Sequence, residues 1–147
     1  MTDPKSELVR KWLDKAQEDL RVAQILARHD DPPAATAIYH CQQAGEKAVK
    51  GFLVWKDHPL EKTHDIGRLA RLALALEPGF GAWIETARKL TQYAIAYRYP
   101  RDSGPEEPDA AELNTALDYA ERLCKYVLRL LPAGIHPDSI APNSPPP

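Results

Sequence analysis

The stretch from residue 38 to residue 55 constrains the fold most, because its apolar residues recur at steps of three and four. This spacing places them on one stripe of a helix. Asp31 is suited to cap this helix, with Pro32 at its first position. The stripe is built largely of small residues, so another backbone can approach it closely. Its members are Ile38, Cys41, Gly45, Ala48, Phe52 and Trp55.

Two amides, a carboxylate and two ammonium groups lie directly beside this stripe, in the run Gln42-Gln43-Ala44-Gly45-Glu46-Lys47-Ala48-Val49-Lys50. Because apolar residues flank them on both sides, Gln42, Glu46 and Lys50 predict a polar seam that needs partners within the fold. On an exposed helix, Glu46 and Lys50 would instead form an ordinary i,i+4 ion pair. The apolar flanks favour a buried polar network that organises the fold, with ligand binding as its second role.

The rest of the chain shows helical periodicity and no strand pattern. We expect helices over residues 5–28 and 83–98, a short helix from an N-cap at Thr63 to Leu76, and a last helix from about Pro108 to Leu131. This order predicts an all-α fold, an antiparallel up-and-down helical bundle of four long helices plus one short helix. Residues 1–131 would form the bundle. Residues 132–147, with six prolines, would form a disordered tail.

Composition excludes several classes of function. The net charge of −2 gives no global field that would attract nucleic acid, so any RNA contact requires a local basic patch. No apolar run approaches the ~18 residues of a membrane span. The first residues lack the apolar segment of a secretion signal, which predicts a cytoplasmic protein. Cys41 and Cys124 are expected to be buried thiols rather than a disulfide or a metal pair.

Established catalytic and metal-binding motifs are missing, since there is no Gly-rich phosphate loop, no His-Glu-x-x-His and no Cys-x-x-Cys. We therefore predict no metal and no cofactor. Three polar clusters remain. They are the run from Gln42 to Lys50, the segment Lys62-Thr63-His64-Asp65 and the segment Arg98-Tyr99-Pro100.

In this order, the three clusters resemble the prokaryotic HEPN domain family. The segment from Trp12 to Leu20 is also similar to the opening helix of that family, and the resemblance covers about residues 5–131. It implies a helical bundle that forms a homodimer, often encoded beside a small nucleotidyltransferase. The roles it implies are nucleotide binding, RNA cleavage as a toxin, or scaffolding of the partner enzyme.

The ribonuclease branches of this family carry Arg-x(4–6)-His, in which a His acts on the 2′-hydroxyl and an Arg stabilises charge on the phosphate. No His follows Arg98 within residues 99–104. A formal match at Arg129 and His136 spans Pro132 and Gly134, and it would place the His in the tail, where catalytic geometry is not fixed. We therefore assign no catalytic residue.

The resemblance implies a non-catalytic module that binds nucleotide or partners a nucleotidyltransferase, including pairs of the toxin–antitoxin type. Lys47, Lys50 and Arg98 would hold phosphate and Tyr99 would stack a base, while Gln42 and Glu46 order the cations. His64 would contact an anion at a helix start or merely pack there. The predicted ligand-binding residues are Gln42, Glu46, Lys47, Lys50, His64, Arg98 and Tyr99.

Two alternatives remain open. One is a metal-independent ribonuclease toxin that uses Arg98 and His64 in place of the missing motif. The other is a purely structural dimeric interaction module, in which the polar cluster is internal. Tyr93 and Tyr97 fit either a base-stacking surface or ordinary core packing.

Overall fold

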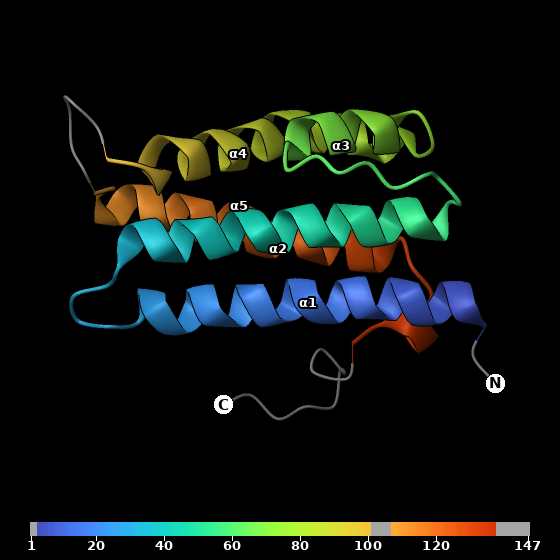
Figure 1. Ribbon diagram of the computed structural model, residues 1–147, viewed down its shortest axis with the longest axis horizontal. Helices are drawn as coiled ribbons and strands as arrows, with labels where there is room; N and C mark the ends of the chain where they lie inside the picture. The colour runs from blue at the N-terminus through green and yellow to red at the C-terminus, as the bar shows by residue number, and fades with distance from the viewer. Residues whose placement is uncertain (1–2, 101–106, 138–147) are drawn as a thin grey trace.

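The chain forms a bundle of α-helices packed along a common long axis (Figure 1). The computed structural model describes residues 3–100 and 107–137, and within them there is no strand. The helices are α1 (Pro4–Ala27), α2 (Ala34–Trp55), α3 (Ile66–Leu74), α4 (Ile84–Arg98) and α5 (Ala110–Arg129), with two 3₁₀ helices, η1 (Pro78–Trp83) and η2 (Ala133–Ile135). The predicted all-α bundle is confirmed.

The bundle has three layers, with α1 on one side, α2 and α5 in the middle, and α3 with α4 on the other side (Figure 1). Helix α2 contacts all four other α-helices. Its predicted apolar stripe is buried, apart from the partly buried Trp55. A Cβ added at Gly45 would lie 3.2 Å from Ile66 Cδ1 and 3.3 Å from Leu123 Cδ2. The glycine therefore allows α3 and α5 to approach α2 closely.

Two predicted helix caps are wrong. Helix α2 begins at Ala34 after Pro33 and has no side-chain cap. Pro32 precedes another proline, which disfavours the helical conformation for Pro32, so the helix starts later than expected and Asp31 lies too far away to cap it. Helix α3 is capped by Asp65, which accepts a hydrogen bond from the Arg68 N–H, while Thr63 accepts one from the Asp65 N–H before the helix begins.

The described fold continues past residue 131. Ile135 and Pro137 are buried, and an Arg10 guanidinium N–H donates to the carbonyl of Gly134 at 2.5 Å. His136 Nε2 lies 2.8 Å and 3.0 Å from the carbonyl oxygens of Leu128 and Leu131. Residues 132–137 thus pack on the bundle, in contrast to the expected tail, and residues 138–147 of that tail lie outside the described residues.

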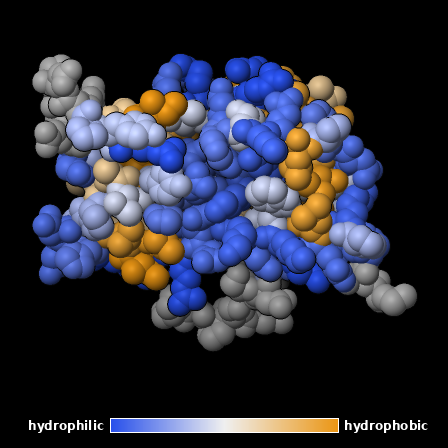
Figure 2. All heavy atoms as spheres, in the orientation of Figure 1, coloured by the Kyte–Doolittle hydropathy of each residue, from blue (hydrophilic) through white to orange (hydrophobic). Residues whose placement is uncertain are grey.

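The surface is mainly hydrophilic on the face shown in Figure 2, with hydrophobic residues gathered in separate patches. Among the exposed large apolar residues, Ile95 and Tyr99 lie one turn apart at the end of α4. No helix in the described ranges is long and apolar enough to cross a membrane. Cys41 and Cys124 are free and buried, as predicted.

Candidate functional site

The predicted polar seam is present and centres on Glu46, whose carboxylate is buried in the middle of α2. Glu46 Oε1 accepts a hydrogen bond from Gln42 Nε2 at 3.2 Å, and Glu46 Oε2 accepts one from Lys50 Nζ at 3.1 Å. His64 Nδ1 lies 3.0 Å from Glu46 Oε1. A buried carboxylate needs such partners, because leaving it unpaired in a medium of low polarity costs several kcal/mol.

The loop between α2 and α3 brings His64 to this carboxylate. Residues 56–65 run back along the bundle after α2 ends (Figure 1). Gln42 Nε2 donates to the backbone carbonyl of His64 at 2.8 Å, and Gln43 Nε2 donates to Gln42 Oε1 at 2.8 Å. The backbone N–H of Ile66 donates to Thr91 Oγ1 at 3.0 Å, which ties the start of α3 to α4. His64 is therefore held through both its backbone and its side chain.

The imidazole of His64 has a defined orientation. Since Nδ1 faces a carboxylate, it carries the proton and donates to Glu46, which leaves Nε2 on the solvent side. The side chain of His64 is 73% exposed. A carboxylate that orients an exposed imidazole in this way presents the lone pair of the outer nitrogen to a ligand.

A pocket of about 170 Å³ opens beside this network, between α2, the start of α3 and α4. Drug-sized ligands usually occupy pockets of about 300–1,000 Å³, so this pocket fits one group, such as a phosphate, with the rest of the ligand outside. Asp65 also lines the pocket, and its Oδ1 already accepts a hydrogen bond from the backbone N–H of Arg68. The lining residues are Gln42, His64, Asp65, Thr91, Ala94, Ile95 and Arg98.

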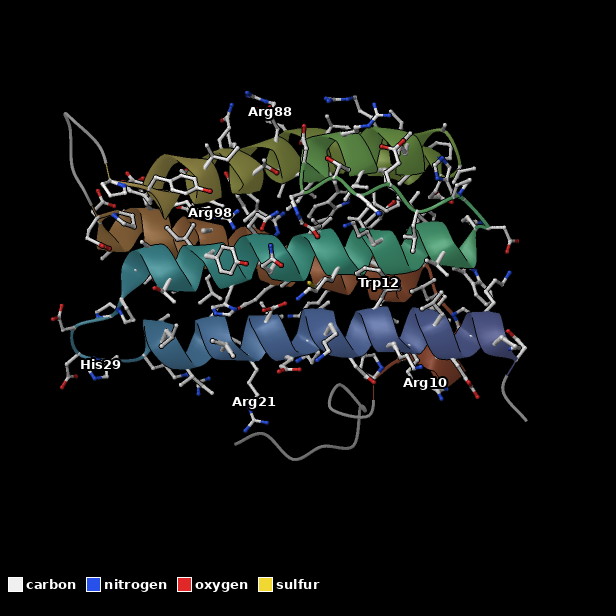
Figure 3. The ribbon with its side chains drawn as sticks, viewed as in Figure 1. Arg10, Trp12, Arg21, His29, Arg88 and Arg98 are labelled. Carbon is white, nitrogen blue, oxygen red and sulfur yellow. The ribbon has the colours of Figure 1, made fainter. Side chains whose placement is uncertain are left out.

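Arg98 lies at the last position of α4, where the helix dipole favours a cation. Its guanidinium carbon lies 5.3 Å from the ring centroid of Tyr39 on α2 and 5.8 Å from that of Tyr99. Figure 3 shows Arg88 pointing outward from α4, whereas Arg98 lies on the side of α4 that faces α2. Among the described residues, no carboxylate forms an ion pair with Arg98.

The two predicted phosphate-binding lysines lie elsewhere. Lys50 is buried, and its ammonium group lies 5.6 Å from the ring centroid of Trp12 besides pairing with Glu46. Lys47 Nζ donates to Asp19 Oδ2 at 2.5 Å, and the same carboxylate pairs with His40 Nδ1 at 2.8 Å. The structure therefore does not bring either lysine to the pocket. Both serve as counter-ions for buried carboxylates.

The predicted tyrosines have different environments. Tyr99 is exposed beside Arg98 but does not line the pocket. Tyr93 packs against the core, and the Tyr97 hydroxyl donates to Glu112 Oε2 at 2.7 Å. Of these three tyrosines, Tyr99 therefore has the exposed ring.

Sequence reasoning missed several residues of these networks. Asp19 was detectable, because its carboxylate falls on the apolar stripe of the first helix, between Ala16 and Ala23. The roles of Thr91 and Ile95 could not be predicted from the sequence, because they depend on how α4 packs against the start of α3. Over the described ranges, no group of three or more His, Cys, Asp or Glu side chains is arranged to hold a metal ion.

His136 and Arg129, the residues of the formal Arg-x(6)-His match, both belong to the described fold. His136 is fixed by the two carbonyl oxygens at the end of α5, and it lines the same groove as Arg129. The expectation that a tail leaves this His unpositioned is therefore wrong for residue 136. Since its Nε2–H donates to the carbonyls, Nδ1 is the nitrogen with a free lone pair.

Comparisons with known proteins agree with the fold. The HEPN domain profile matches residues 9–130. The structure of TT1696 from Thermus thermophilus is similar, with 31% identity and a TM-score of 0.70 over 84% of this chain and 98% of that chain. ST0689, described as an archaeal HEPN homologue, shares the fold, with 24% identity and a TM-score of 0.66 over 83% of this chain and 96% of that chain. No curated protein matches the chain.

Proposed function

The chain belongs to the HEPN domain family, and we propose that it is a non-catalytic nucleotide-binding module that partners a nucleotidyltransferase. The observation that carries the nucleotide-binding proposal is the position of Arg98. Its guanidinium and the His64 ring line one pocket, and no described carboxylate pairs with the guanidinium.

The pocket and its rim offer the groups that a nucleotide needs. A guanidinium donates two parallel N–H bonds to a phosphate, and the lone pair of His64 Nε2 accepts a hydrogen bond from a hydroxyl or amino group of the same ligand. Tyr99 is 68% exposed next to Arg98, so its ring is free to stack a base outside the pocket. The volume of about 170 Å³ suits one phosphate rather than a whole nucleotide. We therefore expect a nucleoside monophosphate to suffice for binding.

The rim of the pocket also supports a role in assembly. Ile95 is 65% exposed and lies one turn from Tyr99, so an apolar surface adjoins the pocket. Large apolar side chains grouped in this way favour contact with another protein surface. We propose that a second copy of the chain or the nucleotidyltransferase covers this surface, as in pairs of the toxin–antitoxin type. The homodimer is tested by the mass of the purified protein in light scattering, where a monomer at all concentrations would contradict it.

A second candidate, a metal-independent ribonuclease, is favoured by one observation. Glu46 orients His64 so that Nε2 faces out, and Arg98 lines the same pocket. A base and a phosphate-binding cation are the two groups that such cleavage requires. The third candidate is a purely structural interaction module, in which the pocket binds no ligand.

Binding of AMP and GMP to the purified protein, measured by isothermal titration calorimetry, tests the proposal. Arg98→Ala should weaken binding at least tenfold. Arg88→Ala is the matched control, because Arg88 is another α4 arginine but pairs with Glu85 on the outer surface. The control should bind as the parent protein does.

Incubation of the same proteins with a structured RNA separates the candidates. Intact RNA together with Arg98-dependent binding supports the proposed function. Cleavage that Arg98→Ala and His64→Ala both abolish would establish the ribonuclease instead. Neither binding nor cleavage would leave the interaction module as the function of the fold.

A further inference from the structure

A second, larger groove lies on the C-terminal half of α5, against η1 and the segment that follows the helix. Its volume is about 480 Å³, within the range of small-molecule sites. No carboxylate is among the described residues that line it. The lining consists of Trp83, Arg122, Lys125, Leu128, Arg129 and His136.

The three cations of this groove form a row along one face of α5. Arg122, Lys125 and Arg129 are separated by three and four residues, which places them on the same side of the helix. With a rise of 1.5 Å per residue, the row spans about 10 Å along the helix axis. The chain as a whole has a net charge of −2, so this groove concentrates positive charge on a slightly acidic protein.

Most of this charge is not neutralised. Neither Lys125 nor Arg129 forms an ion pair with any described residue. Arg122 lies 3.5 Å from Asp118, but both side chains are more than half exposed, so water screens the pair and it is weak. A ligand anion would therefore displace little that stabilises the protein.

The walls of the groove are fixed in advance. The Trp83 ring stacks on Tyr126, with centroids 5.1 Å apart and planes inclined by 26°. The guanidinium of Arg122 lies 5.8 Å from the centroid of the Trp83 ring, and two carbonyl oxygens hold the ring of His136. Because the aromatic wall and His136 are already positioned, binding has to order only the exposed side chains of Lys125 and Arg129.

We propose that this groove binds a ligand with two or three linked phosphates, at a site separate from the pocket of Arg98. A single phosphate is too short to reach a row of about 10 Å, whereas a di- or triphosphate places its charges along it. A long nucleic acid strand fits less well. Asp118 adds negative charge one turn before Arg122, and residues 132–136 follow the other end of the helix.

Titration with sodium tripolyphosphate tests this proposal, because this probe has phosphates and no base. By calorimetry, the parent protein should bind one tripolyphosphate, and the affinity should fall as salt is added. Lys125→Ala/Arg129→Ala should weaken binding at least tenfold. Lys11→Ala/Arg21→Ala is the matched control, since it removes two exposed cations of α1 that form no ion pair with described residues (Arg21 in Figure 3).

Further comparisons decide the ligand class. In Arg98→Ala, which lacks the nucleotide site of the smaller pocket, tighter binding of ATP than of tripolyphosphate would identify a nucleotide as the source of the phosphates, and equal binding would identify inorganic polyphosphate. Orthophosphate should bind at least tenfold more weakly, and equal affinity would overturn the proposal. Equal binding by the groove variant and the parent protein would also overturn it, as would a single-stranded oligonucleotide that binds more tightly than tripolyphosphate.

Arg98→Ala keeps this proposal distinct from the proposed function. It should retain tripolyphosphate binding while losing AMP and GMP binding. Loss of tripolyphosphate binding in Arg98→Ala alone would place the polyphosphate in the smaller pocket and overturn the inference. Circular dichroism and thermal melting of each variant establish that the fold is intact.

Discussion

His64 Nδ1 lies 3.0 Å from Glu46 Oε1, which joins an imidazole whose side chain is 73% exposed to a carboxylate that is 4% exposed. The other oxygen of Glu46 pairs with Lys50, whose ammonium group lies over the ring of Trp12 on α1. One network therefore runs from the first layer of the bundle to the mouth of the pocket. The residues that position the candidate site are the same residues that hold α2 in the core.

Replacement of Glu46 by leucine should destabilise the protein strongly. The buried ammonium of Lys50 would lose its counter-ion, and an uncompensated buried charge typically costs about 3–5 kcal/mol. Urea denaturation followed by circular dichroism measures the loss. Glu46→Leu/Lys50→Met removes both charges and should recover most of the stability, because no unpaired charge remains. A double variant as unstable as the single one would contradict the ion-pair explanation.

Gly79 and Tyr126 should be energetically coupled. A Cβ at Gly79 would lie 2.3 Å from the Tyr126 hydroxyl, which is buried and has no partner among the described residues. Gly79→Ala should therefore cost about 1–3 kcal/mol. Tyr126→Phe removes an unsatisfied polar atom and should be neutral or stabilising.

The double variant Gly79→Ala/Tyr126→Phe should return close to the stability of Tyr126→Phe alone. Gly134→Ala is the control, because nothing lies within 4 Å of an added Cβ there. Additive effects of the two substitutions in the thermal midpoint would show that the hydroxyl is not the cause of the clash.

The bundle is readable in the sequence because helix backbones bond locally and their buried side chains recur at a fixed period. The apolar stripe from Ile38 to Trp55 identifies α2, and the sustained stripe from Leu113 to Val127 identifies α5. The predicted cap of α2 is wrong because residues 32 and 33 are both prolines, and the second disfavours the helical conformation for the first. The burial of Ile135 could not be predicted either, because a single apolar residue between prolines shows no helical or strand periodicity.

The candidate site was predictable only in part. The polar residues flanked by apolar ones on α2 indicated a network, and its members Gln42 and Glu46 do meet His64. Their separation from Lys47 follows from geometry, because adjacent helix residues point about 100° apart. Which side of α2 faces the loop of His64 depends on the path of residues 56–65, and no periodicity encodes the path of a loop.

The free energy of unfolding should fall as the pH rises above about 9, because the thiols of Cys41 and Cys124 are buried. Burial raises the pKa of the Cys41 and Cys124 thiols from 9.0 to about 12. The unfolded chain therefore loses these protons first, and stability that is complete below pH 9 declines toward pH 12, by at most about 1.4 kcal/mol per pH unit for each thiol. The urea midpoint of Cys41→Ala/Cys124→Ala should decline less steeply between about pH 9 and pH 11. Equal slopes for both proteins would contradict this account.

Lys47 should affect stability and leave nucleotide affinity unchanged, because its ammonium pairs with Asp19 away from the pocket. In Lys47→Met, the buried Asp19 carboxylate keeps only His40, so the urea midpoint should fall. The dissociation constant for AMP should stay within twofold of the parent value. A tenfold weaker affinity for AMP in a folded Lys47→Met variant would show that Lys47 contributes to the binding site after all.

Imidazole NMR during titration with AMP can locate the nucleotide in the pocket of Arg98 and His64, because the chain contains five histidines at separate positions. The resonances of His64 should shift saturably, and those of His58 and His136 should not. In Arg98→Ala the shift of His64 should require at least tenfold more AMP. Saturable AMP binding that moves His136, or any histidine other than His64, would place the nucleotide elsewhere and contradict the assignment of this pocket.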